Sequence, residues 1–269
     1  YKFDRSTTGR ATRQVKMIDY RIATRIEEME QIIDLEIEIW GVSERDAFPP
    51  HFLMLPQHHG GVVMIAEDGG RIIGFCLAMP VRRDGEWCLW SNIAGVHPDY
   101  QGQKVGETLK HKQRDWARDN DYASVHWTFD PLQARNANFN LNRLGVVVRT
   151  YHRNIYGVMQ DSINGGMPSD RLETVWFTDD NMLQQPSPPV VLDEVAFLVY
   201  ADGARPVVKL KSGDRHMYGI MLPHTRDNTL EAWQTAVRRA FQHAFAQGYE
   251  GYGFVRDAPN PYYLLRKRR

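Results

Sequence analysis

The feature that most constrains this chain is a glycine-containing turn between an apolar segment and an amphipathic one. The segment Leu89 to Val96 is apolar and ends just before Pro98, and the turn Gln101 to Gly106 follows. Residues Glu107 to Asn120 then place apolar side chains at helical spacing. The sequence therefore predicts a strand, a tight turn and a helix in direct succession.

A helix that begins in this way offers an anion the unpaired N–H groups of its first turn and the positive end of its dipole. Gly102 and Gly106 lack the Cβ atom that would keep a bulky phosphate away from the backbone. The turn is therefore predicted to hold a phosphate or a pyrophosphate. Such a turn alone is a weak signal, because most glycine-containing turns are ordinary loops.

Turn signals and apolar periodicity divide the rest of the chain into strands and helices. Asp68-Gly69-Gly70 separates two apolar segments and predicts a hairpin, so three consecutive strands are expected to be antiparallel neighbours. Thr24 with Glu27 has the capping-box spacing, and Gly41 is a helix stop. The strands expected in the first part of the chain are Tyr20–Ala23, Val62–Glu67, Ile72–Met79, Trp87–Val96, Ala123–Phe129, Val146–Tyr151 and Arg171–Phe177.

A second group of elements follows a proline-rich segment. Residues 179–189 are polar and contain three prolines, which is typical of a linker. Beyond it the sequence predicts a hairpin around Ala201-Asp202-Gly203, a strand at Arg215–Leu222, a helix capped by Asn228 and ended by Gly248, and two last strands. We therefore divide the chain into an N-terminal arm (1–19), a main domain (20–178), the linker (179–189) and a C-terminal α+β lobe (190–269).

Composition bounds the kind of protein. Lys plus Arg equals Asp plus Glu at 33 each, so net charge does not indicate nucleic acid or a membrane as partner. No apolar segment approaches the ~18 residues of a membrane-spanning helix. The two cysteines, Cys76 and Cys88, lie in apolar segments and are expected to be buried thiols in a reducing cytoplasm. The histidines lack metal-ligand spacing, so no metal is predicted.

The turn resembles the signature of the GNAT superfamily of acyl-CoA-dependent N-acyltransferases. The superfamily carries Val-x-Pro-x-Tyr-[Gln/Arg]-Gly-x-Gly-x-[Gly/Ala] at the end of its fourth strand. The matching residues here are Val96, Pro98, Tyr100, Gln101, Gly102, Val105 and Gly106. Lys104 stands where the superfamily usually has glycine, and its ammonium group could add a phosphate contact.

A later segment fits the second half of the same pattern. Asn136, Ala137, Leu144 and Gly145 resemble the superfamily's Asn–Ala helix, which runs to a glycine turn. The whole segment from Trp127 to Gly145 is similar to a branch of predicted acetyltransferases with a C-terminal extension. The resemblance covers about Tyr20 to Phe177 and, more loosely, the helix expected from Asn228 to Gly248.

The resemblance implies an α/β (α+β) fold with a mixed, mostly antiparallel central sheet flanked by helices. It also implies acetyl-CoA as co-substrate, with the pantetheine arm gripped between splayed fourth and fifth strands. The residues expected to bind CoA are Ala94, Val96, Gln101, Gly102, Gln103, Lys104, Val105, Gly106, Asn136, Phe139 and Arg143. Arg135 and Arg149 join Arg143 as candidates for the 3′-phosphate.

The catalytic groups are less clear from the sequence. In the superfamily a tyrosine often protonates the departing thiolate, but Leu141 occupies that position here. Tyr151 and Tyr156 are the candidate acids, and Glu36 is the first candidate base. As further candidate bases we keep Glu67, Asp130 and His126.

The leading hypothesis is an N-acetyltransferase that moves an acetyl group from acetyl-CoA to a primary amine of a small molecule or amino acid. A CoA-binding module without catalysis, used for sensing or assembly, is the alternative that Leu141 favours. Transfer to protein lysines or N-termini is a third hypothesis. A cytoplasmic protein is expected, with no nucleic-acid or membrane partner, and a homodimer is left open.

Overall fold

The computed structural model describes residues 17–43, 47–158, 166–183, 194–210, 216–225 and 227–268. Its strands are β1 (Asp19–Ile22), β2 (Val62–Asp68), β3 (Arg71–Arg83), β4 (Glu86–Val96), β5 (Ser124–Phe129), β6 (Val147–His152), β7 (Arg171–Phe177), β8 (Ala196–Asp202), β9 (Arg205–Val208), β10 (Met217–Met221), β11 (Tyr249–Val255) and β12 (Tyr262–Lys267). Its helices are α1 (Ile26–Trp40), α2 (Pro50–His58), α3 (Val105–Asp119), α4 (Ala134–Ala137), which a π-helix (Asn138–Arg143) continues, and α5 (Leu230–Ala246).

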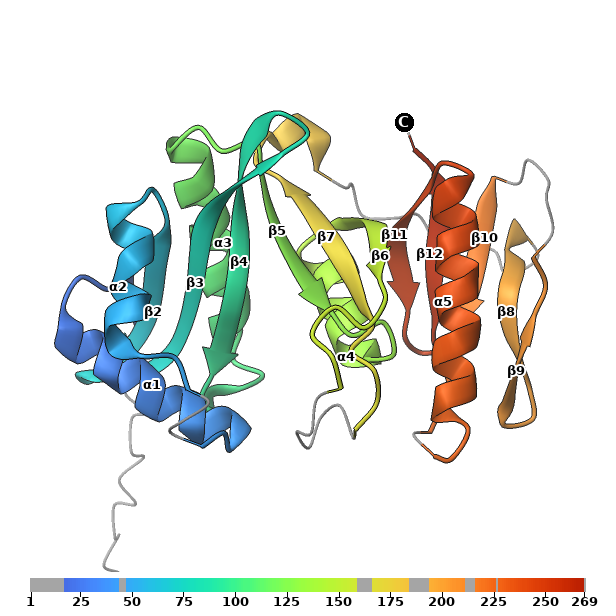
Figure 1. The fold of residues 1–269 in the computed structure, drawn as a ribbon, viewed down its shortest axis with the longest axis horizontal. Coiled ribbons are helices and arrows are strands. Elements are labelled where there is room, and N and C mark those ends of the chain that lie inside the picture. The colour runs from blue at the N-terminus through green and yellow to red at the C-terminus, as the bar shows by residue number, and fades with distance from the viewer. Residues whose placement is uncertain are drawn as a thin grey trace, which may run out of the picture.

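The strands of the described residues form one sheet in the order β1-β2-β3-β4-β5-β7-β6-β11-β12-β10-β8-β9 (Figure 1). Neighbouring strands are antiparallel except in two pairs, β4–β5 and β8–β10. The predicted fold class, a mixed and mostly antiparallel sheet with flanking helices, is therefore confirmed, as is the antiparallel run β2-β3-β4.

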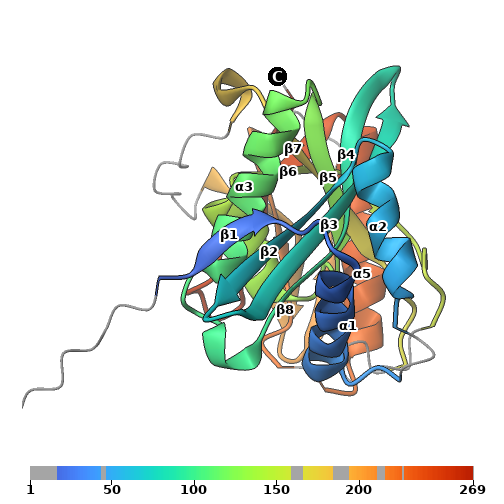
Figure 2. The ribbon, with the colours of Figure 1, turned by 90° about the vertical axis from the view of Figure 1, so that its left-hand side faces the viewer.

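Helices cover both faces of the N-terminal half of the sheet (Figure 2). Alternate side chains of β2 point to opposite faces, as the strand period requires. Val63 and Ile65 pack with Met29 and other side chains of α1, whereas Val62 packs with Leu109 of α3. Burial on both faces explains why this strand is an almost unbroken apolar run.

The helix α1 begins one residue later than the capping-box spacing predicts. The carboxylate of Glu28, not that of Glu27, accepts hydrogen bonds from the amides of Thr24 (2.7 Å) and Arg25 (3.0 Å). Glu28 is buried and also pairs with Arg21 at 2.6 Å. At the other end Gly41 has a left-handed backbone (φ 65°) and terminates the helix, as predicted.

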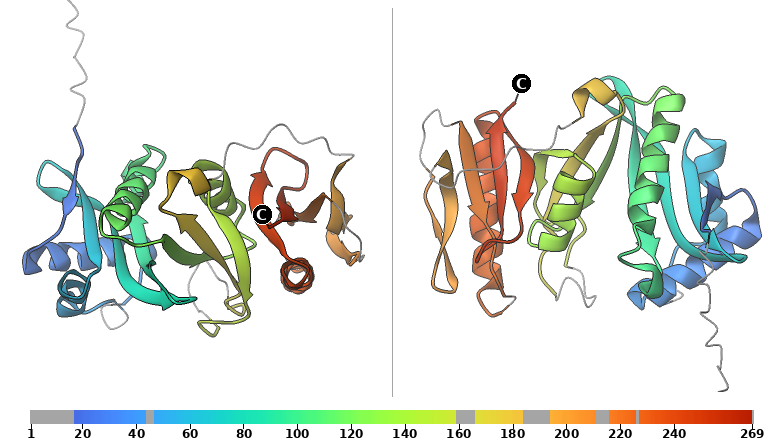
Figure 3. Two further views of the ribbon diagram at one scale, coloured as in Figure 1. Left: turned by 90° about the horizontal axis from the view of Figure 1, so that it is seen from above. Right: turned by 180° about the vertical axis from the view of Figure 1, so that it is seen from behind.

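The C-terminal strands extend the same sheet. β11 lies beside β6 at the register pair Gly251–Val148, where a Cβ atom on Gly251 would come within 2.5 Å of the valine side chain. The Tyr263 hydroxyl donates to the carbonyl of Pro131 at 2.7 Å. In Figure 3, α5 lies on the same side of the sheet as α1 and α2, and α3 lies on the opposite side.

Several predicted boundaries differ in detail from the structure. The helix expected to carry Asn136 and Ala137 and to run to Gly145 is a short α-helix that passes into a π-helix, because the amide of Leu144 bonds five residues back to Phe139. The helix expected to be capped by Asn228 has Thr229 at its N-cap instead. Most of the predicted arm (residues 1–16) and of the predicted linker (184–189) lies outside the described residues, and the domain boundaries remain predictions.

Among the described residues, no helix combines the length and the apolar character needed to cross a membrane.

The Glu28 cap predicts a pH-dependent contribution to stability. Burial alone would raise the pKa of Glu28, but the two amides and the two arginines outweigh it and lower the pKa from its usual 4.5 to about 2. A carboxyl with a lowered pKa stabilises the fold above the unfolded value and loses that effect as the pH falls from about 4.5 to about 2. We expect Glu28→Gln to cost roughly 1–3 kcal/mol of unfolding free energy at pH 7.

Urea unfolding across pH 3 to 7 measures this difference, which should shrink as the solution becomes more acidic. Glu30→Gln, on the exposed side of the same helix, is the matched control. A Glu28→Gln cost that is the same at every pH would contradict the proposed role of the ionised cap.

Candidate active site

The turn that follows β4 has the backbone that an anion-binding helix end needs. The chain leaves β4 at Val96, and α3 begins at Val105. Gly102 (φ 79°) and Lys104 (φ 65°) both adopt the left-handed conformation, which reverses the chain direction. The amides of the first helical residues, Val105 to Glu107, have no acceptor within the helix. The strand, turn and helix predicted from the sequence are therefore present.

A groove of about 660 Å³ opens at this helix end, between the turn, the end of α1 and the π-helix. It brings together ten of the eleven residues predicted to bind CoA: Ala94, Val96, Gln101, Gly102, Lys104, Val105, Gly106, Asn136, Phe139 and Arg143. The eleventh, Gln103, is not among the lining residues, and its side-chain amide donates to the carbonyl of Asp99 at 2.9 Å.

Four basic side chains line the groove: Lys104, Arg135, Arg143 and Arg256. Arg143 forms an ion pair with Glu107, and Arg135 donates to Gln101 at 3.3 Å. Arg149, the third arginine considered for a phosphate, lies elsewhere and pairs with Glu250 at 2.9 Å. An anion in the groove would thus meet a positive potential to which the C-terminal lobe contributes through Arg256.

The groove continues into a cavity of about 270 Å³ between β4 and β5. These parallel strands are paired only at Leu89–Val125 and Trp90–His126 and then diverge. Groove and cavity share lining residues at the end of β4 and on the π-helix, including Phe139. The predicted splay of the fourth and fifth strands is therefore present and forms one channel with the groove.

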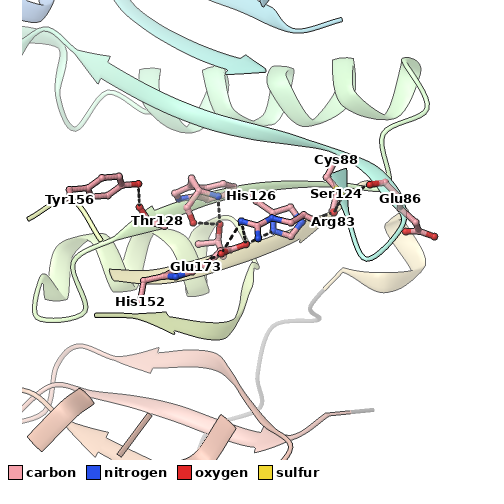
Figure 4. Close-up of polar contacts among 11 residues, drawn as sticks. Arg83, Glu86, Cys88, Ser124, His126, Thr128, His152, Tyr156 and Glu173 are labelled. Atoms are coloured by element: carbon pink, nitrogen blue, oxygen red, sulfur yellow. Dashed lines mark hydrogen bonds and ion pairs between the residues drawn. The ribbon is translucent and has the colours of Figure 1, made fainter. Parts of the chain in front are cut away.

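A cluster of charged and polar side chains lies beside the splay (Figure 4). Its centre is Glu173 on β7, which is buried. The carboxylate lies 3.2 Å from Nδ1 of His126 on β5, 2.6 Å from Nε2 of His152 on β6 and 3.3 Å from the guanidinium of Arg83 on β3. Trp127 contacts α3, so the alternation along β5 places His126 on the opposite face, that of α1 and α2.

The surroundings of Glu173 keep it ionised. Burial alone would raise its pKa, but the hydrogen bonds to His126 and His152 and the charge of Arg83 outweigh it, and the pKa is lowered. A carboxylate that accepts from two imidazoles also selects their tautomers. His152 bonds through Nε2, which leaves Nδ1 as the nitrogen that could accept a proton.

Two further side chains of β5 belong to this region: Ser124 bonds to the cluster, and Thr128 lines the channel. Ser124 Oγ lies 2.8 Å from Nε2 of His126 and 3.2 Å from the thiol of Cys88. Thr128, which lines the splay cavity, hydrogen-bonds to the hydroxyl of Tyr156 at 3.1 Å. The hydrogen-bond network around Glu173 and the channel thus share strand β5, next to the point where β4 and β5 diverge.

The residues considered for catalysis occupy different environments. Tyr156 is half-exposed and adjoins the channel through Thr128. Tyr151 stacks on Phe241 of α5 and donates to Asp170 at 2.7 Å, and burial raises the pKa of its phenol. Glu36 on α1 is buried, which raises its pKa, and it accepts one long bond of 3.5 Å from the amide of Phe48. The structure does not join these three into one site.

Leu141, at the position where the superfamily often has the proton-donating tyrosine, packs in the interior of the protein. Its side chain is buried in the hydrophobic core, within the π-helix. Its neighbour Asn140 lines the splay cavity instead and accepts from the indole N–H of Trp127 at 3.2 Å. No tyrosine is among the residues lining the cavity within the described part of the chain.

Sequence reasoning missed Glu173, His152, Arg83 and Arg256. The alternation of a polar Glu173 within the apolar strand Arg171–Phe177 was the one available signal. That signal does not identify the residues that bond to Glu173, because the position of β7 between β5 and β6 is known only from the folded sheet. Arg256 carries no local signal, since it reaches the groove from the far end of the chain.

Both cysteines, Cys76 and Cys88, are buried free thiols, as expected. In the described part of the chain, no three or more His, Cys, Asp and Glu side chains are grouped so that they could hold a metal ion.

Comparison with known proteins gives a family for the N-terminal part of the chain. Residues 29–145 match the model of the acetyltransferase (GNAT) family. A comparison with curated proteins finds none that matches the chain.

Solved structures with a similar fold include an N-acetyltransferase from Staphylococcus aureus (12% identity, TM-score 0.50, 61% of this chain and 99% of that one). The ribosomal-protein-S18-alanine N-acetyltransferase of Escherichia coli is 15% identical (TM-score 0.48, 62% of this chain and all of the other, 100%). A protein from Salmonella typhimurium, solved with acetyl-CoA, is 19% identical (TM-score 0.49, 61% and 95%). At these identities the likeness describes the fold.

The left-handed Lys104 allows a prediction for the groove. An L-residue in this conformation costs about 1 kcal/mol that glycine does not, so Lys104→Gly should raise the unfolding free energy by about that amount. Lys104→Ala keeps the strain and should not. Both variants remove the ammonium group and should weaken CoA binding roughly 5- to 10-fold at low salt.

Calorimetric titration with CoA at two salt concentrations, together with thermal unfolding, separates the two effects. Lys112→Ala, at an exposed position on α3, controls for the loss of a charge. Equal stability of the glycine and alanine variants would show that the backbone of residue 104 is not strained.

Proposed function

We propose that the protein moves an acetyl group from acetyl-CoA to a primary amine of a small molecule or amino acid, with the part that matches the GNAT family model (residues 29–145) as the acetyltransferase domain. The main observation behind this proposal is a single channel with a different chemical feature at each end. An anion-binding helix end lies at its entrance, and a buried acid–base cluster adjoins its inner end. A simple CoA-binding module would need the first feature only.

The shape and charge of the groove support the proposed binding of CoA. The pyrophosphate would accept hydrogen bonds from the amides of Val105 to Glu107, at the positive end of the α3 dipole. Arg143 and Arg256 lie where they could hold the 3′-phosphate. Since β5 diverges after His126, the backbone of β4 beyond Trp90 is left to pair with the amides of the pantetheine arm.

Transfer would occur where the strands part. The register of β3 and β4 shifts between Ser91 and Ile93, so Asn92 is the extra residue of a β-bulge. A backbone N–H at this bulge is the candidate to stabilise the oxyanion that forms when an amine attacks the thioester carbonyl. The tetrahedral intermediate then collapses, the thiolate leaves and the new amide remains.

The cluster around Glu173 is our candidate for the base. The ionised carboxylate orients His126 and His152, and the imidazole pair accepts the proton that the amine loses, directly or through water. Thr128 and Tyr156 are placed to hydrogen-bond the acceptor. Glu36 of α1, with its raised pKa, is the alternative base.

The arrangement of the sheet favours a small acceptor. The C-terminal strands and α5 continue along the face that carries the cluster, where an extended peptide would otherwise have to lie. The name of the Escherichia coli protein gives an alanine of ribosomal protein S18 as its acceptor, so polypeptides belong in any test.

Release of the CoA thiol, followed with a chromogenic disulfide, tests the proposal over a panel of amino acids, polyamines, amino sugars and short peptides. Turnover of at least one small amine is expected. If the protein prefers peptides, the acceptor is a polypeptide and not a small amine. Calorimetric binding of CoA without turnover of any compound would favour the non-catalytic sensor or assembly module, which Leu141 also favours.

Removing the central carboxylate should separate catalysis from folding. We expect Glu173→Gln to lower kcat roughly 10²-fold with little change in the KM for acetyl-CoA, because the carboxylate adjoins the acceptor and not the groove. The matched control is Glu250→Gln, a second buried carboxylate that pairs with two arginines away from the channel. An equal loss in both variants would point to structure, and a larger loss in Glu36→Gln would move the base to α1.

A further inference from the structure

Lys110 is a fully buried lysine on α3, one turn beyond the residues of the anion site. Its Nζ donates to Ser91 Oγ at 2.9 Å and to Gln113 Oε1 at 2.8 Å, and it lies 3.7 Å above the ring of Trp127. Its partners among the described residues include no carboxylate, which a buried lysine usually needs. A packing role alone would be served better by an apolar side chain of similar size.

The side chain lies at the inner end of the channel. Lys110, Ser91 and Trp127 all line the splay cavity. The pantetheine arm has twelve backbone bonds from the phosphate oxygen to the sulfur, as long as about four residues of extended chain, or ~14 Å. Counted along β4 from Val96, at the anion site, that length ends at Asn92. The sulfur of a bound CoA would therefore lie beside the pair Ser91–Lys110.

The surroundings of the amine suit a group that gives up a proton. Burial lowers the pKa of Lys110 from 10.5 to about 7, and the nearby thiol of Cys76 on β3 would offset this in part only if it were ionised. Burial also raises the pKa of Cys76 to about 11, so that thiol is neutral at pH 7. The other groups that contact the amine, Ser91, Gln113 and Trp127, carry no charge.

We propose that Lys110 is the acid that protonates the CoA sulfur as it leaves, an inference that rests on the proposed acetyl transfer. When the tetrahedral intermediate collapses, the carbon–sulfur bond breaks and its electron pair stays on sulfur. Nζ gives one proton to that sulfur, so CoA leaves as the thiol and the lysine is left neutral. A proton from solvent restores the ammonium group before the next turnover.

This assignment explains how the site can work with Leu141 where a tyrosine is usual. The proton would come from α3, across the cavity from the π-helix, so Leu141 is free to pack in the core. Acid and base would then lie on opposite faces of the sheet: Lys110 on that of α3, the Glu173 cluster on that of α1 and α2.

Kinetics of Lys110→Met test the step, with Lys112→Met on the exposed side of the same helix as the matched control. Methionine has a similar volume and needs no hydrogen bond, so the variant should fold. We expect kcat to fall roughly 10²-fold, the KM for acetyl-CoA to stay within about 3-fold, and the alkaline limb of the kcat–pH profile near pH 7 to disappear. Lys110→Arg should be equally slow, because arginine holds its proton.

A second readout does not depend on turnover. The ultraviolet absorbance of the thiolate reports the titration of CoA bound to the full chain, and desulfo-CoA gives the baseline. An ammonium group beside the sulfur should make the thiol titrate at least about one pH unit lower in the native protein than in Lys110→Met. If both proteins give the same titration, Lys110 does not contact the sulfur and the inference is overturned, whatever the change in kcat.

The two readouts also separate this inference from the proposed function. A lowered thiol titration in a native protein that acetylates no amine would support the contact between Lys110 and sulfur and refute the acetyl transfer. Turnover in Lys110→Met at the native rate would overturn the assignment of the acid and leave the acetyl transfer standing.

Discussion

The incomplete pairing of β4 with β5 is the constraint on which the rest of the structure depends. Two register pairs hold the strands together, and beyond Trp90–His126 they separate. Unpaired backbone groups in the interior are costly unless something bonds to them, so a strand that ends its pairing inside a sheet leaves a binding site for a ligand with amides of its own. The anion site at the start of α3 lies at the outer end of this opening, which gives the channel its direction.

Two ionisable side chains, Glu173 and Lys110, are buried next to this opening. Glu173 is ionised within the sheet because two imidazoles and a guanidinium bond to it, whereas Lys110 has only neutral partners and a lowered pKa. The two groups lie on opposite faces of the same pair of strands. An enzyme that must take a proton from an amine and return one to a thiolate needs two such groups, at different places and with different proton affinities.

The C-terminal half takes part in the site by extending the sheet. Asn142 of the π-helix exchanges two hydrogen bonds with the backbone of Phe254, at 2.7 and 3.1 Å. This contact fixes the end of β11, so that Arg256, two residues further on, lines the groove. The predicted C-terminal α+β lobe thus shares both a sheet and the groove with the part of the chain that matches the GNAT family model.

The local sequence was enough to predict many of the strands and helices of this protein and the position of its groove. The glycine turn, the apolar runs and the Asn136–Gly145 segment predicted the strands and the turn before α3. They also predicted eleven residues for a CoA site, ten of which line one groove, because each of these signals depends on neighbours within a few positions. The N-caps of α1 and α5 lie one residue after the predicted ones, and a π-helix replaces part of a predicted α-helix. Tertiary packing, not the local sequence, decides these details. Only the tertiary structure could bring Glu173 to His126 and His152, Lys110 to Ser91 and Arg256 to the groove. Those contacts join strands and helices that are distant in sequence, and the order of strands in a sheet is set by the packing of the whole chain.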